Sequence, residues 1–149
     1  MMKRLHPISG TVALLLICSF WISTTLSELF GSAATITTVK TLIPWGLLLL
    51  VPAMATVGLT GTTIGQRRHG PLVEAKRKRM PIIAANGVLV LIPAALFLAM
   101  KARAGAFDGA FYAVQGIELI AGAVNIWLLS RNMRDGMRLS GKRELPSAG

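Results

Sequence analysis

Apolar residues occur along this chain in four long runs, and the short segments between the runs hold most of the charge. Each run, folded as an α-helix, is long enough to cross the roughly 30 Å hydrocarbon core of a bilayer. The apolar residues fill the runs instead of recurring on one face only, which is typical of helices in contact with lipid. We therefore predict four transmembrane helices, over residues 8–30, 42–64, 81–100 and 110–129.

The first run has a second interpretation, because small residues follow it at Gly31 and Ser32, as they do at the cleavage site of a signal peptide. The run is longer than the apolar core of about 7–15 residues that such a peptide usually has. Cleavage would also remove one helix from an even set. We therefore predict that the first run is retained as a transmembrane helix.

The sixteen Lys and Arg residues are distributed unevenly among the connecting segments. Thirteen lie in the N-terminal lead, in a basic loop over 65–80 and in the tail 131–149, and three lie in the two other connections. Lys and Arg stay on the cytoplasmic side of membrane proteins, so both termini are expected to be cytoplasmic and the tail to be disordered there. Since short loops join antiparallel neighbours, we predict a single all-α domain, an integral membrane bundle of four helices with up-down-up-down topology.

The composition excludes several other classes of protein. A mean hydropathy of +0.61 and a hydrophobic content of 53% are too high for an ordinary soluble domain. The net charge of +10 is not arranged as a basic face with interleaved aromatic residues, so we expect no nucleic acid partner. Cys18 and the two histidines show no zinc-ligand spacing, and the signatures of P-loops, nucleophile elbows and zinc proteases are absent.

The protein is therefore expected to be non-enzymatic, to bind no metal, and to reside in the inner membrane of a bacterium. Its expected partners are the lipid bilayer and anionic lipid headgroups, which the basic loop would attract. Further copies of the chain or other membrane subunits are expected to pack against its apolar faces.

Polar residues recur on one face of the fourth run, where Gln115, Glu118 and Asn125 follow helical spacing. A carboxylate inside a span is costly in contact with lipid, so this face should point into the bundle. The first and third runs supply further polar residues at suitable depths. The predicted buried polar site consists of Glu118, Gln115, Asn125, Asn86, Ser23, Thr24 and Glu28.

This site has two interpretations. Glu118 can act as a titrating or coordinating group on a path for protons or cations, or the polar residues can form interhelical hydrogen bonds that hold the bundle together. The second interpretation is favoured for the asparagines. Glu28, at the outer end of its run, is expected to pair with Lys40 or Lys101 at the level of the lipid headgroups.

The two histidines provide an alternative site. His6 precedes the first run and His69 follows the second, so both are expected at the cytoplasmic end. Histidines on neighbouring helices can bind one haem b from opposite faces, and a four-helix bundle is a suitable host. Arg67 and Arg68 would then bind the haem propionates. The main interpretation predicts no cofactor, and haem b belongs to this alternative only.

Three functions are compatible with these observations. The first is a small non-enzymatic membrane protein with a buried polar site around Glu118, either a subunit of a larger complex or a self-assembling bundle. The second is an electron-transfer bundle that holds haem b through His6, with or without His69. The third is a small transporter that uses Glu118 to couple to protons or cations.

Overall fold

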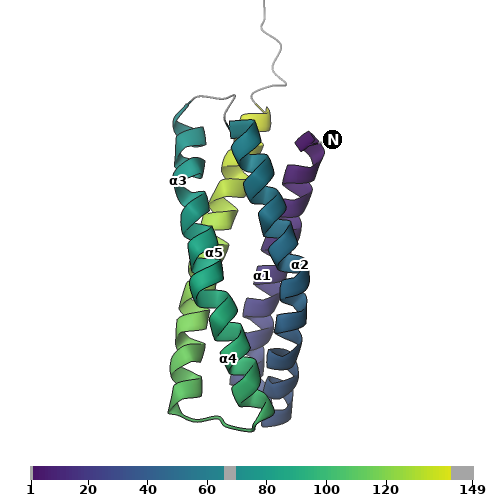
Figure 1. The fold of residues 1–149 in the computed structure, drawn as a ribbon, viewed down its shortest axis with the longest axis vertical. Helices are drawn as coiled ribbons and strands as arrows, with labels where there is room; N and C mark the ends of the chain where they lie inside the picture. The colour runs from purple at the N-terminus through teal and green to yellow at the C-terminus, as the bar shows by residue number, and fades with distance from the viewer. Residues whose placement is uncertain (1, 66–69, 142–149) are drawn as a thin grey trace, which may run out of the picture.

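The computed structural model describes residues 2–65 and 70–141, with side chains over 6–61 and 70–138. Every regular element in this part of the chain is helical. Since α3, η1 and α4 follow one another without a break, they form one long helix (Figure 1). In chain order the elements are α1 (Met2–Phe30), α2 (Ala33–Gly65), α3 (Pro71–Asn86), the π-helical turn η1 (Gly87–Leu91), α4 (Ile92–Arg103) and α5 (Gly109–Gly141).

Within the described residues, four helical segments are long and apolar enough to cross a membrane. The prediction of an all-helical protein with four such segments is confirmed. Large apolar side chains point outward from the bundle, among them Leu48, Leu89 and Ile120, as expected where the surroundings are lipid. The four segments are His6–Phe30, Ala33–Gly61, Pro71–Arg103 and Gly109–Arg138.

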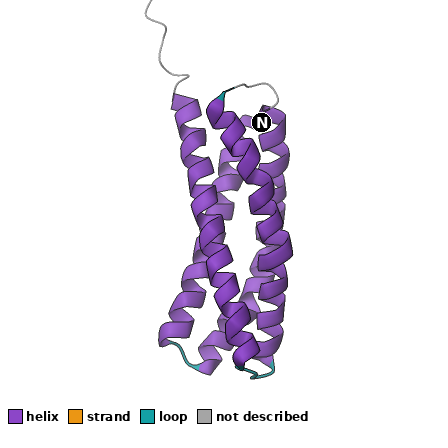
Figure 2. Cartoon of the chain, turned by 90° about the vertical axis from the view of Figure 1, so that its left-hand side faces the viewer, coloured by secondary structure: helices purple, strands orange, loops and turns teal. Residues whose placement is uncertain are grey.

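The long helices lie side by side, with their ends gathered at two levels (Figures 1 and 2). The start of α1, the end of α2, the start of α3 and the end of α5 lie at the upper end of Figure 1. The connections from α1 to α2 and from α4 to α5 lie at the lower end. Helix α1 packs against α2 and α5, and α2 also packs against α4.

The helices meet along seams in which buried residues recur every third or fourth position. On α2 the buried residues Ile36, Ile43, Leu50 and Val57 are seven residues apart, and Lys40 lies between the first two. A seven-residue repeat of buried positions is the pattern of helices that pack as in coiled coils. The seam thus directs one cationic side chain into the bundle interior.

The helices extend beyond the predicted boundaries at several ends. Helix α1 begins at Met2 and not near residue 8, and α2 begins at Ala33 and not near residue 42. Helix α3 begins at Pro71 inside the predicted loop 65–80, α4 ends at Arg103, and α5 continues to Gly141 past residue 129. Hydropathy identifies only the part of a helix that lipid can surround. Polar turns that continue the helix at either end have low hydropathy, so they are not recognised as part of the span. The predicted disordered tail is helical as far as Gly141, and its remainder lies outside the described residues.

Candidate functional site

The most deeply buried charged side chain of the described residues is that of Lys40 on α2, which is 0% exposed. Its Nζ lies 2.5 Å from Oε2 of Glu118 on α5, whose side chain is 12% exposed. The same ammonium donates to the hydroxyl of Thr24 on α1 at 3.4 Å. The predicted location of Lys40, in a loop at the headgroup level, is corrected: α2 begins earlier than predicted, so Lys40 lies inside the bundle and pairs with Glu118. Lys101, the other predicted partner of Glu28, pairs with Asp108.

Two further side chains complete this group. The Gln115 amide donates to Glu118 Oε2 at 3.1 Å. The Glu28 carboxyl on α1 interacts electrostatically with both Lys40 and Glu118. Within the described part of the chain, Glu28 Oε1 and Gln115 Oε1 are buried and have no hydrogen-bond partner. We name the group formed by Thr24, Glu28, Lys40, Gln115 and Glu118 the Lys40 cluster.

The position of the Lys40 cluster along the bundle follows from the outward-facing charges. Asp108, directly before α5, and Arg131 on α5 are exposed at the lower and upper ends of the apolar part, about 34 Å apart along the helix axis. This distance is close to the thickness of a hydrocarbon core. Glu118 lies about 15 Å above Asp108, so its ion pair with Lys40 lies well inside the apolar part of the bundle. Glu28 lies nearer the lower end, because α1 ends at Phe30.

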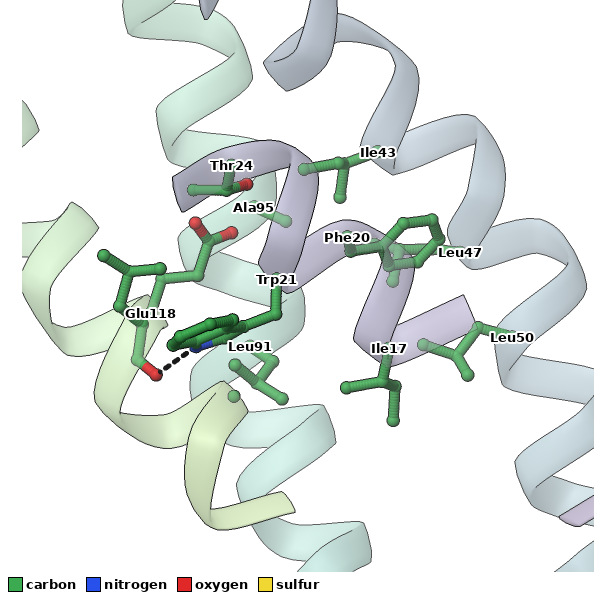
Figure 3. Close-up of a pocket in the computed structure, with 12 residues that line it drawn as sticks. Ile17, Phe20, Trp21, Thr24, Ile43, Leu47, Leu50, Leu91, Ala95 and Glu118 are labelled. Carbon is green, nitrogen blue, oxygen red and sulfur yellow. Dashed lines mark hydrogen bonds between the residues drawn. The ribbon is translucent and has the colours of Figure 1, made fainter. Parts of the chain in front are cut away.

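A cavity of about 60 Å³ adjoins the Lys40 cluster between α1, α2, α4 and α5. Figure 3 shows Glu118 and Thr24 at one side of it and aliphatic side chains such as Ile17 and Leu50 at the other. The Trp21 indole borders the cavity and donates to the Leu119 carbonyl oxygen at 2.9 Å. A cavity of this size can hold a few water molecules.

Ser23, which was predicted to lie in the buried site, has a different environment. Its hydroxyl donates to the carbonyl oxygen of Phe20 in its own helix at 3.1 Å. It also lines a separate, more open hollow of about 350 Å³ between α1 and α2, together with Ser27 and Thr35. The adjacent residue Thr24 is the one that joins the Lys40 cluster, because it points to the seam with α2 and α5.

The predicted asparagines form a second polar contact, higher in the bundle. Asn86 Nδ2 donates to Asn125 Oδ1 at 2.9 Å and to the Ala121 carbonyl oxygen at 2.9 Å. Asn125 in turn donates to the Ile83 carbonyl oxygen at 3.4 Å. The pair joins α3 to α5, which agrees with the interpretation of the asparagines as interhelical hydrogen bonds.

The π-helical turn η1 begins directly after Asn86. Proline has no N–H, and its ring clashes with the carbonyl group four residues before it. Pro93 follows η1 at the start of α4, and the N–H of Ile92 bonds to the Gly87 carbonyl oxygen five residues earlier. The wider turn thus lets one long helix pass through a proline next to the asparagine contact.

His6 takes part in a hydrogen-bonded chain near the upper end of the bundle. Lys76 Nζ lies 3.0 Å from His6 Nε2, and His6 Nδ1 lies 2.8 Å from Thr60 Oγ1. The Thr60 hydroxyl donates to the Thr56 carbonyl oxygen at 2.6 Å. Since the ammonium can only donate, His6 is the neutral tautomer with its proton on Nδ1, which donates to Thr60.

The haem alternative stays a prediction. Both ring nitrogens of His6 have protein partners, so an iron atom would have to displace Lys76 or Thr60. His69, Arg67 and Arg68 lie outside the described residues. An absorption spectrum of the purified protein tests this alternative, because bound haem gives an intense visible band.

Another polar group joins α3 to the upper part of α5. Arg79 lies 2.6 Å from Asp135 Oδ2 and donates to Asn132 Oδ1 at 3.4 Å. The Asn132 amide contacts the Met80 sulfur atom at 3.4 Å. Both Asn132 and Asp135 are buried, so the predicted disordered tail 131–149 is wrong for these residues.

Lys40 is a functional candidate that the hydropathy pattern does not indicate, because the apolar run begins only at Leu42. The sequence does carry a signal for its burial, since Lys40 lies on the face of α2 that also carries Ile36, Ile43 and Leu50. Asn132 carried a similar signal, because it follows Asn125 by seven residues.

No protein-family model matches the chain, and neither the curated proteins nor the solved structures contain a match. The described residues also contain no group of three or more His, Cys, Asp or Glu side chains that could hold a metal ion. The chemistry of the site therefore follows from its own ion pair and hydrogen bonds.

Proposed function

We propose that this protein is a small, non-enzymatic integral membrane protein that carries a proton or a small cation across the bilayer, with Lys40 and Glu118 at its centre. The observation that carries the proposal is the complete burial of the Lys40 side chain beside a carboxylate, inside an apolar bundle. Ionisable groups at such depth are costly, and in membrane proteins they typically belong to ion paths or binding sites.

A purely structural role explains this ion pair less well. Burying two charges costs desolvation free energy that their attraction repays only in part, so packed apolar residues often stabilise a fold equally well. Neutral side chains such as Asn86 and Asn125 hold helices together without any charge. A buried ammonium therefore favours a function that uses the charge.

Polar groups along α5 support a path through the interior. Glu118, Asn125 and Asn132 follow one another at seven-residue intervals, so the same face presents a polar side chain about every 10 Å. The cavity beside Glu118 offers room for a few water molecules within one of these intervals. Its volume suits a proton or a small cation and is well below the 300–1,000 Å³ that is typical of pockets for larger ligands.

Proton or cation flux into liposomes that contain the purified protein tests this function. We expect Glu118→Gln to reduce the flux to the level of empty liposomes, because the variant lacks the carboxylate that bonds to Lys40. Glu74→Gln is the matched control, since Glu74 is exposed on α3, and it should leave the flux unchanged. An unchanged flux in Glu118→Gln would contradict the proposal.

We further propose an up-down-up-down bundle in the inner membrane of a bacterium, with both termini in the cytoplasm. The upper end presents many more exposed cations than the lower end, and Lys40 no longer counts for the lower end because it is buried. Positive residues favour the cytoplasmic side and attract anionic lipid headgroups there. Among the residues whose side chains are described, the exposed cations are Arg77, Lys78, Arg131, Arg134 and Arg138, on the upper parts of α3 and α5, and Arg103, at the lower end of α4.

Single cysteines at exposed positions test this orientation in a Cys18→Ser background. A membrane-impermeant thiol reagent added to whole cells should label Ala104→Cys, at an exposed position of the lower end, and leave Arg77→Cys unlabelled. Labelling of both positions, or of Arg77 alone, contradicts the proposed orientation.

The outward apolar side chains support contacts with lipid, with further copies of the chain or with other membrane subunits. Purification in a mild detergent followed by native mass spectrometry tests for the protein contacts. We expect a homo-oligomer or a stoichiometric complex, and a lone monomer under these conditions contradicts this part of the proposal.

A further inference from the structure

We propose that the ion bound by the Lys40 cluster is a single exchangeable proton, shared by the carboxyl groups of Glu28 and Glu118, with Lys40 as their permanent counter-ion. This inference rests on the proposed function, because it names the ion that the protein would carry. The site itself is argued from charge balance and hydrogen bonding.

The charged side chains of the Lys40 cluster lack one positive charge for neutrality. The Lys40 ammonium of α2 lies beside the Glu118 carboxyl group of α5 and also contacts Thr24 of α1. Glu28 lies one helical turn below Thr24 on the same face of α1, so a second carboxyl group shares this ammonium. The nearest charged residue of α4, Lys101, pairs instead with Asp108 at the water-exposed end, where the two groups are 2.5 Å apart. An unmatched charge in an apolar interior is so costly that the group neutralises instead. One proton on the carboxyl pair makes the Lys40 cluster neutral.

Two buried oxygen atoms of the cluster have no hydrogen-bond partner among the described residues, and both would accept from a hydrogen-bond donor. Gln115 is only 4% exposed, and its side chain is directed to Glu118, to which its amide donates. Its Oε1 and the Oε1 of Glu28 are buried without a partner in the described part of the chain. Both atoms are hydrogen-bond acceptors, so a proton or cation suits them and an anion does not. A proton on Glu28 converts one of these acceptors into a donor.

A metal ion suits these residues less well. Calcium and magnesium take six or more oxygen ligands, and the described residues offer no group of three or more acidic or histidine side chains. The Lys40 ammonium already occupies Glu118 Oε2, so a metal ion at this carboxylate would meet a positive charge at close range. A proton forms part of the carboxyl group and needs no such coordination shell.

The chemical step is a reversible protonation. Uptake of a proton from hydronium forms one O–H bond on a carboxylate oxygen of the pair, releases one water molecule, and changes the charge of the cluster from −1 to 0. Release of the proton to water reverses these changes. Since the two carboxyl groups share one counter-ion, their titrations are coupled, and either Glu28 or Glu118 can carry the proton.

The number of protonated carboxyl groups in the cluster should follow charge balance in every variant. We expect one in the wild-type protein, none in Glu28→Gln or Glu118→Gln, and two in Lys40→Met. Glu74→Gln changes an exposed acid on α3 and should retain one. Infrared spectroscopy of the full-length protein in liposomes at neutral pH measures this number from the carbonyl stretch of the carboxylic acid.

A wild-type protein without the carboxylic acid band would overturn the proposal, and so would a band that survives in Glu28→Gln. A band that shrinks when sodium replaces potassium at constant pH would assign the site to a metal cation. The Gln variants keep the size of the side chain, so the test does not depend on the folding of Lys40→Met. A protein with the expected bands but no flux keeps the proton site and loses the carrier function.

Discussion

The Phe20 ring of α1 lies directly against Gly46 of α2, where a Cβ would lie 2.4 Å from the ring Cζ. Real Cβ atoms do not approach other heavy atoms this closely, so Gly46→Ala must displace the ring or separate the two helices. We expect the substitution to lower the free energy of unfolding by about 1–3 kcal/mol, which is typical of overpacking. Thermal unfolding in detergent measures the effect.

Gly58→Ala on the same helix is the control for this prediction. A Cβ on Gly58 meets no atom within 4 Å, and Ala is a better helix former than Gly by about 0.5–1 kcal/mol. This variant should match or exceed the wild-type stability. Equal stability of the two variants would show that Phe20 does not need the space at Gly46.

Lys40→Met should be among the more destabilising single substitutions in this chain. It leaves Glu118 buried without its counter-ion, and breaking a buried pair in this way typically costs about 3–5 kcal/mol. The double variant Lys40→Met, Glu118→Met should recover most of the loss, because it removes both charges. Chemical unfolding of the three proteins gives the coupling free energy, and simple additivity would contradict the pairing.

The contact between Asn86 and Asn125 should contribute modestly to stability. Asn86→Ala removes the donor to Asn125 and to the Ala121 carbonyl oxygen. Interhelical hydrogen bonds of membrane proteins average about 0.6 kcal/mol and reach about 1.7 kcal/mol. We expect a loss of unfolding free energy in this range, and little change in ion flux. A loss of flux would give the asparagines a functional role that we do not assign to them.

The end of α5 should depend on the ion pair between Arg79 and Asp135. Asp135→Ala removes the acceptor that lies 2.6 Å from Arg79 and holds this end of α5 against α3. We expect backbone amides after Ser130 to exchange with deuterium about tenfold faster, which corresponds to a loss of about 1.4 kcal/mol in local stability. Arg134→Ala, at an exposed position one residue earlier, should leave the exchange unchanged.

Asp108 at the lower end predicts a pH dependence of stability. The hydrogen bond from Lys101, and then the one from the backbone N–H of Phe111, hold the pKa of the Asp108 carboxyl below its usual value. A lowered folded-state pKa gives a stabilising contribution that is complete above the unfolded pKa of about 3.9 and is lost as the pH falls through the folded pKa. The melting temperature should therefore fall on acidification below about pH 4.

Asp108→Asn should reduce this fall, because an amide does not titrate in that range and still caps α5. Lys101→Met should also reduce it, since Lys101 is the main cause of the lowered pKa. Melting curves at a series of pH values test both expectations. Identical pH profiles in the wild type and both variants would exclude Asp108 as the source.

The sequence predicted some residues of the site correctly and others not. Glu118, Gln115 and Thr24 were placed in one layer because helical periodicity relates residues within one helix and hydropathy gives their depth. Ser23 was placed with them, but its neighbour Thr24 faces the seam instead, since adjacent residues on a helix differ by about 100° in direction. Depth alone does not specify direction.

The burial of Lys40 could not be predicted from hydropathy. Hydropathy placed it outside the membrane because a positive charge normally ends a span. Inside the bundle, the Glu118 carboxylate offsets this charge, and Glu118 and Glu28 come near Lys40 only when α1, α2 and α5 pack together. The same applies to Asn132 and Asp135, which α3 holds in place.

The sequence by itself determined that the chain forms four apolar helices, because the transfer of a helical segment into lipid depends on the residues of that segment alone. Only the tertiary structure decided which charges pair, since an ion pair between helices depends on their relative rotation and register. The buried ammonium of Lys40 is stable only because residues far from it in the chain supply its partners.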